Sequence, residues 1–339
     1  MILEGVIGVW LQFLASAAIL VVAAIKLADY GDVIGVRTRL GGMFVGTLLL
    51  AGATSLPELL TAANSMAQGV PNLTVGDLFG SSMFNMLMLA VLDLMFQQKR
   101  LLRRVAISHA VSAALAVLLM AMAMFFILAD IELQIGWVGL DSLLLMGMYG
   151  FGMWLIRSSP TVQMDLFGGA HPLEPSAEMP SLRHALIGFA LSAGVLVITA
   201  PFMVRSAVRI AEITGLTTGI VGMVFIAVMT SLPEVVTTVS AVHAGALDLA
   251  VGNLFGSNIF NMFVLGFIDL FYTQGRLFAS VSPAMIMAGM LGLMLTALAG
   301  LGNLARVERR ILFLEVDALF IILFYGLGMW LLITRRLLF

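Results

Sequence analysis

Long apolar runs, broken by short clusters of charged and turn-forming residues, make up most of this sequence of 339 residues. A helix needs about 20 mostly apolar residues to cross a bilayer. Dividing the chain at its charges and turn residues predicts ten such spans, which is typical of an all-α membrane protein. The spans are residues 5–27, 41–67, 72–96, 106–129, 135–156, 184–204, 217–243, 247–272, 280–301 and 312–333.

One hydrophilic stretch interrupts this pattern near the middle of the chain, between Arg157 and His184. Its prolines and charges are typical of a linker. We therefore expect a first five-helix repeat at residues 1–157, a short linker at 158–183 and a second five-helix repeat at 184–339.

The distribution of basic residues predicts the orientation of the spans, because cytoplasmic loops carry an excess of Lys and Arg. With the N-terminus outside, 12 of the 17 Lys and Arg residues lie on the cytoplasmic side and 5 on the other. We therefore expect both termini outside, the linker in the cytoplasm, and a multi-pass protein of the plasma membrane.

Composition supports the membrane interpretation and excludes several other functions. Hydrophobic residues are 61% of the chain and charged residues 11%, against about 25% charged in a soluble domain. The net charge of -2 argues against a nucleic-acid partner. The absence of cysteine removes disulfides and thiolate metal sites. We expect no cofactor, and the sequence indicates no obligate protein partner beyond the lipid bilayer.

The two halves are related by a constant shift of 176 positions. Residues 46–94 match residues 222–270 without a gap at 22 of 49 positions. Because five spans is an odd number, the second copy enters the membrane from the opposite side. Inverted repeats of this kind are common in secondary transporters, which bind their substrate near the midplane between the copies.

Each copy carries a glutamate inside a predicted span, Glu58 in the first and Glu234 in the second, directly after a proline. A charged side chain at mid-membrane costs about 2.5–3.5 kcal/mol on insertion scales. Pro57 and Pro233 should break their helices and free carbonyl oxygens. A bound cation would satisfy both the carboxylates and the carbonyls.

Helical spacing brings further oxygen ligands to the same faces. In the first copy they are Ala51, Thr54, Thr61, Ser81 and Asn85, and in the second they are Ala227, Thr230, Thr237, Ser257 and Asn261. Two carboxylates with amides, hydroxyls and carbonyls suit Ca²⁺ or Na⁺, and they do not suit zinc or copper. The alternatives are that the hydroxyls bond their own backbone and that the asparagines only join helices.

The remaining acidic residues have simpler interpretations. Asp77 either lines an access path or supports the site from behind. Asp93 and Asp269 fall near span ends, where an interfacial carboxylate is the default. Asp141 and Asp317 lie near the starts of the fifth and tenth spans, where helix capping or solvation at the interface explains them.

The paired segments resemble a known family. T-S-L-P-E at 54–58 and 230–234, each followed by G-S-x-x-F-N, is similar to the α-repeats of the sodium/calcium exchangers, within the cation/calcium antiporter superfamily. The resemblance implies exchange of Ca²⁺ for Na⁺ by alternating access, with the long first and sixth spans sliding together. It implies four central ligands, which are Glu58, Asn85, Glu234 and Asn261. It also implies flanking Na⁺ sites lined by Thr54, Ser55, Ser81, Thr230, Ser231 and Ser257 and the carbonyls of Ala51 and Ala227.

Three positions depart from the family pattern. The glycine that commonly precedes T-S-L-P-E is Ala53 in one copy and Met229 in the other, which implies a less open helix break. Asn261 stands where the potassium-dependent branch has aspartate, which argues against K⁺ co-transport.

The sequence leaves other functions open. Protons could replace Na⁺, because burial disfavours the charged form of both glutamates, which would make the protein an H⁺/Ca²⁺ exchanger. A cation channel fits inverted repeats with broken helices less well. An enzyme is the weakest hypothesis, because the repeat holds no nucleophile with a neighbouring base.

Overall fold

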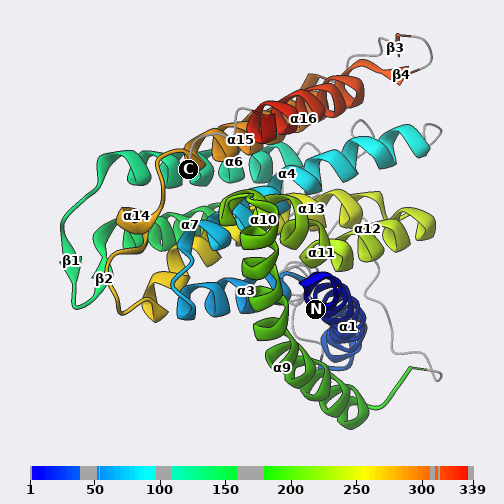
Figure 1. Cartoon of the computed structure of the whole chain (residues 1–339). Helices are drawn as coiled ribbons and strands as arrows, with labels where there is room; N and C mark the ends of the chain where they lie inside the picture. Colours follow the sequence, from blue (N-terminus) through cyan, green and yellow to red (C-terminus); the bar gives the residue numbers. More distant parts are fainter. Residues whose placement is uncertain are drawn as a thin grey trace.

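A computed structural model describes residues 2–38, 52, 54–96, 108–158, 179–305, 310–311 and 314–334, and it is almost entirely helical (Figure 1). The helices of the first half are α1 (Ile2–Thr38), α3 (Leu56–Ala67), α4 (Pro71–Met95), α6 (Ser108–Ala129) and α7 (Leu140–Ser158). Those of the second half are α9 (Leu182–Thr214), α10 (Thr218–Val221), the π-helix η1 (Gly222–Ile226), α11 (Ala227–Thr230), α12 (Leu232–Ala244), α13 (Leu247–Phe267), the 3-10 helix η2 (Ile268–Phe271), α14 (Leu277–Ser280), α15 (Met285–Ala305) and α16 (Val316–Thr334).

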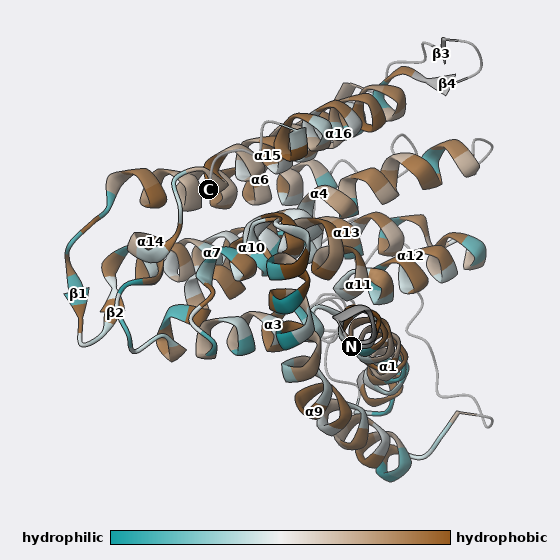
Figure 2. Ribbon diagram, viewed as in Figure 1, coloured by the Kyte–Doolittle hydropathy of each residue, from teal (hydrophilic) through white to brown (hydrophobic). Residues whose placement is uncertain are grey.

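Seven of the described helices are long and apolar enough to cross a membrane, or eight if a bent pair counts as one span. Their outward side chains are apolar as well: Phe125, Trp154 and Trp330 are each about 60% exposed. Figure 2 shows apolar residues along most of the helices. Because so much exposed apolar surface is unfavourable in water, these side chains face lipid. The protein is therefore an all-α, multi-pass membrane protein.

The number of ten spans stays a prediction. The span predicted at 41–67 begins outside the described residues, and only its second part is seen, as α3. The span predicted at 135–156 corresponds to α7, which is not among the seven long apolar helices. The other eight predicted spans coincide with described helices.

Two small hairpins show how the two halves are oriented relative to each other. Strand β1 (Gln134–Ile135) pairs with β2 (Val138–Gly139), and β3 (Arg310–Ile311) pairs with β4 (Leu314–Glu315), both antiparallel. Every residue of the second hairpin lies 176 positions after its counterpart in the first. The hairpins nevertheless lie at opposite ends of the molecule (Figure 1). Equivalent segments at opposite ends are what inverted repeats produce.

Helices α4 and α13 form the centre of the bundle. In both, 67% of the most apolar 18-residue stretch is buried, compared with 22% in α16. They pack against each other, α4 also packs against α15, and α13 also packs against α6. Their side chains contribute to one large hydrophobic core. The two copies of the G-S-x-x-F-N segment are therefore on the most protected helices of the protein.

A second, separate core joins α1 to α9. Phe13 and Leu20 of α1 pack there with Leu196 and Met203 of α9, all of them fully buried. Arg37, in the last turn of α1, donates to the carbonyls of Met179 and Pro180, just before α9 begins. Figure 1 shows this pair set apart from α6, α15 and α16. These two helices, the longest in the described part of the chain, thus pack together beside the bundle, and their core also includes Leu73 of α4, Val221 of α10 and Ile226 of η1.

The helix break predicted at Pro233 is confirmed. Helices α11 and α12 meet at Ser231 with a bend of 41°. At the corresponding place in the first copy, Ser55 lies in a turn before α3, and Pro57 is in the first helical turn. Proline is tolerated there because the first amide groups of a helix have no partner inside it. Ala53 lies outside the described residues.

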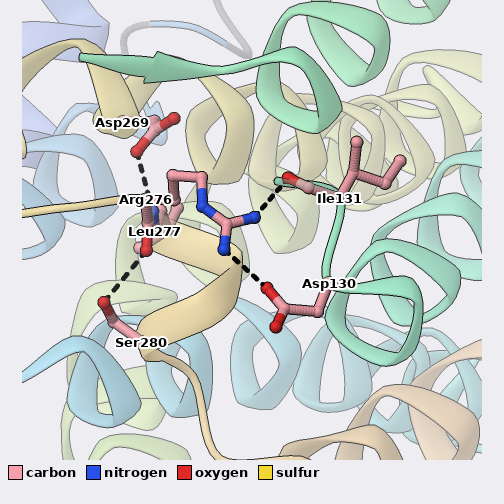
Figure 3. Close-up of polar contacts among 6 residues, drawn as sticks. All are labelled: Asp130, Ile131, Asp269, Arg276, Leu277 and Ser280. Carbon is pink, nitrogen blue, oxygen red and sulfur yellow. Dashed lines mark hydrogen bonds and ion pairs between the residues drawn. The ribbon is translucent and has the colours of Figure 1, made fainter. Parts of the chain in front are cut away.

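The end of the bundle that carries β1 and β2 is held by polar contacts to loop backbone (Figure 3). Asp269 accepts hydrogen bonds from the Gly139 amide at 2.8 Å and the Leu277 amide at 2.9 Å. Arg276 binds Asp130 at 2.9 Å and also donates to the carbonyl of Ile131. Asp269 is fully buried and accepts backbone hydrogen bonds inside the protein; its place at a membrane interface stays a prediction. Its counterpart Asp93 is also fully buried.

Candidate cation-binding site

Both repeated glutamates begin a helix at the centre of the molecule. Glu58 lies in the first turn of α3 and Glu234 in the first turn of α12, each directly after the helix-starting proline. Unpaired amide groups give a helix N-terminus a partial positive charge, which favours a carboxylate there. The L-P-E sequence therefore explains both the helix start and the position of the charge.

The described residues of the predicted site are all enclosed by protein. Each has an exposed fraction of 0%; they are Thr54, Ser55, Glu58, Ser81, Asn85, Ala227, Thr230, Ser231, Glu234, Ser257 and Asn261. Ala51 lies outside the described residues. The side chains come from α3, α4, α11, α12 and α13 and from the turns before α3 and α12, so both repeats contribute.

Serine hydroxyls connect the repeats in a crossed pattern. Ser55 donates to Glu234 Oε1 at 2.9 Å and lies 2.9 Å from Ser257 Oγ, so it joins the site in the other copy. In the matching contacts, Ser231 lies 3.4 Å from Glu58 Oε1 and 2.8 Å from Ser81 Oγ. Each glutamate is thus contacted by the serine that precedes the glutamate of the opposite repeat.

The same glutamates keep one oxygen each without a partner. Glu58 Oε2 and Glu234 Oε2 are buried and accept no hydrogen bond, and neither does the amide oxygen of Asn85 or that of Asn261. Buried carboxylate oxygens without a partner are costly. In the described part of the chain, the one buried basic side chain is His109, which pairs with Asp248 at 3.1 Å instead. Among the described residues, no basic side chain therefore neutralises the two buried glutamates.

The chemistry of these donors fits a hard cation. The described residues contain no group of three or more His, Cys, Asp or Glu side chains placed to hold a metal ion. Any ion here would be held by two carboxylates with amide, hydroxyl and carbonyl oxygens. Ca²⁺ accepts such a mixed set of 6–8 oxygens, and zinc does not prefer it.

Asp77 is a residue whose role the sequence left open. It is 1% exposed and accepts hydrogen bonds from Thr61 at 2.8 Å and from Thr230 at 3.1 Å. It therefore supports a threonine of the opposite repeat. Its counterpart Asn253 donates to the hydroxyls of Thr237 and Thr238, both at 3.1 Å. The substitution of Asn for Asp at a repeated position, near the start of the third and eighth predicted spans, was the signal in the sequence.

Asn258 was not singled out from the sequence at all. It lies on α13, is fully buried, and accepts a hydrogen bond from Asn85 at 3.0 Å. Asp141 and Asp317 lie in the first turns of α7 and α16, and each accepts from the next amide in its helix. They are placed at helix starts, as expected for capping residues.

The chain is similar in sequence to known proteins. The sequence profile described as "Sodium/calcium exchanger protein" matches residues 8–157 and 184–334. Over 311 residues, the chain is 27% identical to the CaxA protein of Alkalimonas amylolytica, covering 87% of this chain and 91% of that protein.

Two solved structures share the fold. The H⁺/Ca²⁺ exchanger CAX superposes with a TM-score of 0.65 and 11% identity, over 97% of this chain and 88% of that one. The sodium-calcium exchanger NCX_Mj superposes with a TM-score of 0.57 and 18% identity, over 96% of this chain and 99% of that one. The profile match covers most of the chain in two separate segments. The chain therefore belongs to the sodium/calcium exchanger protein family.

Proposed function

We propose that this protein is a secondary active antiporter that exchanges Ca²⁺ for Na⁺ across the plasma membrane by alternating access. One observation carries the proposal: Glu58 and Glu234 are each contacted by a serine of the opposite repeat, and each keeps a buried oxygen without a partner. Two carboxylates match the charge of one Ca²⁺. The four central ligands are Glu58, Asn85, Glu234 and Asn261.

Coupling follows from sharing these oxygens between the two ions. Na⁺ ions would use the same glutamates together with Thr54, Ser55, Ser81 and the corresponding residues Thr230, Ser231 and Ser257, with the carbonyls of Ala51 and Ala227. A site with two buried negative charges is costly to move across the membrane when it is empty. The protein would therefore change its access only when the site holds Ca²⁺ or Na⁺.

The moving part would be the α1–α9 pair. It packs in a hydrophobic core separate from the large core of α6, α13 and α15. The core of the pair also includes Leu73 of α4, Val221 of α10 and Ile226 of η1, so the pair would slide over these side chains as it moves. Rigid-body movement of one part of a transporter against another, around a fixed site, is a recognised form of alternating access. We place both termini outside and the linker in the cytoplasm, with the first repeat ending at residue 157 and the second beginning at 184.

The second candidate is an H⁺/Ca²⁺ exchanger that uses the same glutamates. The shared fold with CAX favours it, and so does the enclosure of both carboxylates, which disfavours their charged form. A cation channel is a third and weaker candidate, because the fully enclosed ligands do not form an open path.

Purified protein in liposomes distinguishes these candidates. Uptake of ⁴⁵Ca²⁺ is measured with an outward gradient of Na⁺, of H⁺ or of K⁺, and with no gradient, always with the membrane potential clamped. We expect Na⁺ to drive uptake and K⁺ to have no effect. Uptake driven by H⁺ alone would identify the second candidate, and uptake indifferent to all three gradients would overturn antiport.

A further inference from the structure

A chain of amide and hydroxyl contacts lies behind Asn85, where α4, α13 and α15 meet. Asn258 of α13 donates through Nδ2 to the carbonyl of Ser82 at 3.2 Å and to Thr296 Oγ1 at 3.3 Å. Thr296 donates its own hydroxyl hydrogen to the carbonyl of Gly292 at 2.8 Å. Thr296 therefore has only an acceptor to offer to Asn258.

These contacts determine which way the Asn258 amide points. A backbone carbonyl and a hydroxyl oxygen both require its NH₂ group, so its Oδ1 must point to the other side. That oxygen accepts from Asn85 Nδ2 at 3.0 Å. Asn85 must in turn offer its NH₂ group to Asn258, which leaves Asn85 Oδ1 buried and without a partner. The Ser82 carbonyl and the Thr296 hydroxyl thus set, through Asn258, the orientation of an amide on α4.

Asn261, the counterpart of Asn85, lacks a corresponding support. The counterpart of Asn258 is Ser82, and the Ser82 hydroxyl bonds the Leu78 carbonyl of its own helix at 2.9 Å. Accordingly, neither the oxygen nor the nitrogen of the Asn261 amide has a partner, although both are buried. The two central asparagines are equivalent in sequence but not in how they are held.

We propose that Asn258 is a positioning residue: it fixes the Asn85 carbonyl oxygen toward the bound cation and makes Asn85 a better Ca²⁺ ligand than Asn261. A preoriented oxygen binds the ion without the cost of ordering the side chain. Residues that orient a metal ligand typically change affinity by 10–100-fold when they are replaced. This inference rests on the proposed site at Glu58 and Glu234. It adds that Asn85 contributes more to Ca²⁺ binding than Asn261 does.

The test replaces Asn258 with serine, the residue at the equivalent position of the first repeat. Asn258→Ser places the counterpart residue behind Asn85, and Ca²⁺ binding to purified protein is measured by calorimetry alongside the Ca²⁺ dependence of uptake. We expect about a 10-fold higher half-saturating Ca²⁺ concentration, with the maximal rate largely retained. In an Asn85→Ala background, Asn258→Ser should add no further loss, because the ligand that it orients is gone. An equal loss in both backgrounds would mean that Asn258 only joins helices.

Thr296 supplies a second pair of variants in case Asn258→Ser fails to fold. Thr296→Val removes one of the two acceptors that orient Asn258 and should weaken Ca²⁺ binding, whereas Thr296→Ser keeps the hydroxyl and should bind Ca²⁺ like the wild type. Equal Ca²⁺ affinity in the two variants would overturn the inference. If the wild type itself binds no Ca²⁺, both the proposed function and this inference fail. If the wild type binds Ca²⁺ and the Asn258 and Thr296 variants bind it equally well, the inference fails and the proposed function stands.

Discussion

Glu58→Gln should abolish Ca²⁺ exchange and leave a folded protein that resists heat at least as well as the wild type. Glutamine keeps the shape of the side chain but removes the charge that the cation neutralises. Burying a neutral amide is also less costly than burying a carboxylate without a partner. The measurements are ⁴⁵Ca²⁺ uptake in liposomes and thermal unfolding in detergent without Ca²⁺. Glu234→Gln should behave in the same way, because the two glutamates have matching contacts.

The matched control is Glu212→Gln, which makes the same chemical change on the surface of α9. Glu212 is more than half exposed and pairs with Arg209. Exposed ion pairs contribute little to stability, so we expect normal uptake and a nearly unchanged unfolding temperature. Near-normal Ca²⁺ flux in Glu58→Gln or Glu234→Gln would contradict the assignment of the site.

Gly76→Ala should destabilise the protein strongly, although it adds only one methyl group. A Cβ atom at Gly76 would lie 2.2 Å from the backbone carbonyl oxygen of Gly219, and one at Gly222 would lie 2.4 Å from that of Leu73. Helix α4 therefore touches α10 and η1 backbone to backbone, and the added methyl must push them apart. Overpacking of this kind costs about 1–3 kcal/mol. Because α11 with Thr230 follows η1 directly, uptake should fall as well.

The repeat supplies the control for this prediction. At Gly252, the counterpart of Gly76, the nearest atom to an added Cβ is Cε1 of His109 at 3.1 Å, which belongs to a side chain that can move. Gly252→Ala should therefore lower the unfolding temperature much less than Gly76→Ala. Thermal unfolding is monitored by size-exclusion chromatography. Equal shifts in the unfolding temperature of Gly76→Ala and Gly252→Ala would show that Gly76 is not needed for the backbone contact of α4 with α10.

Much of this arrangement could be predicted from the repeat. The shift of 176 positions paired Glu58 with Glu234, and inverted topology required the two copies to face each other across the membrane. The break at Pro233 followed from the missing amide hydrogen of proline. These features depend on local chemistry and on symmetry, both of which can be read from one sequence.

The crossed contacts could not be predicted in the same way. Helical spacing says which residues share a face of their own helix, but Ser55 bonds the glutamate of the other copy. The burial of Asp269 depends on where Gly139 and Leu277 come to lie after folding. Asn258 was missed because its counterpart is Ser82, so a search for identical residues passes over it.

Competition between Ca²⁺ and Na⁺ for one site is the central claim, and Ca²⁺ binding to purified protein tests it most directly. Ca²⁺ is titrated at increasing Na⁺ concentration, with choline replacing Na⁺ to keep the ionic strength constant. Shared oxygens predict that the apparent Ca²⁺ dissociation constant rises continuously with Na⁺ and reaches no plateau. A Ca²⁺ affinity that stays the same at every Na⁺ concentration would contradict it.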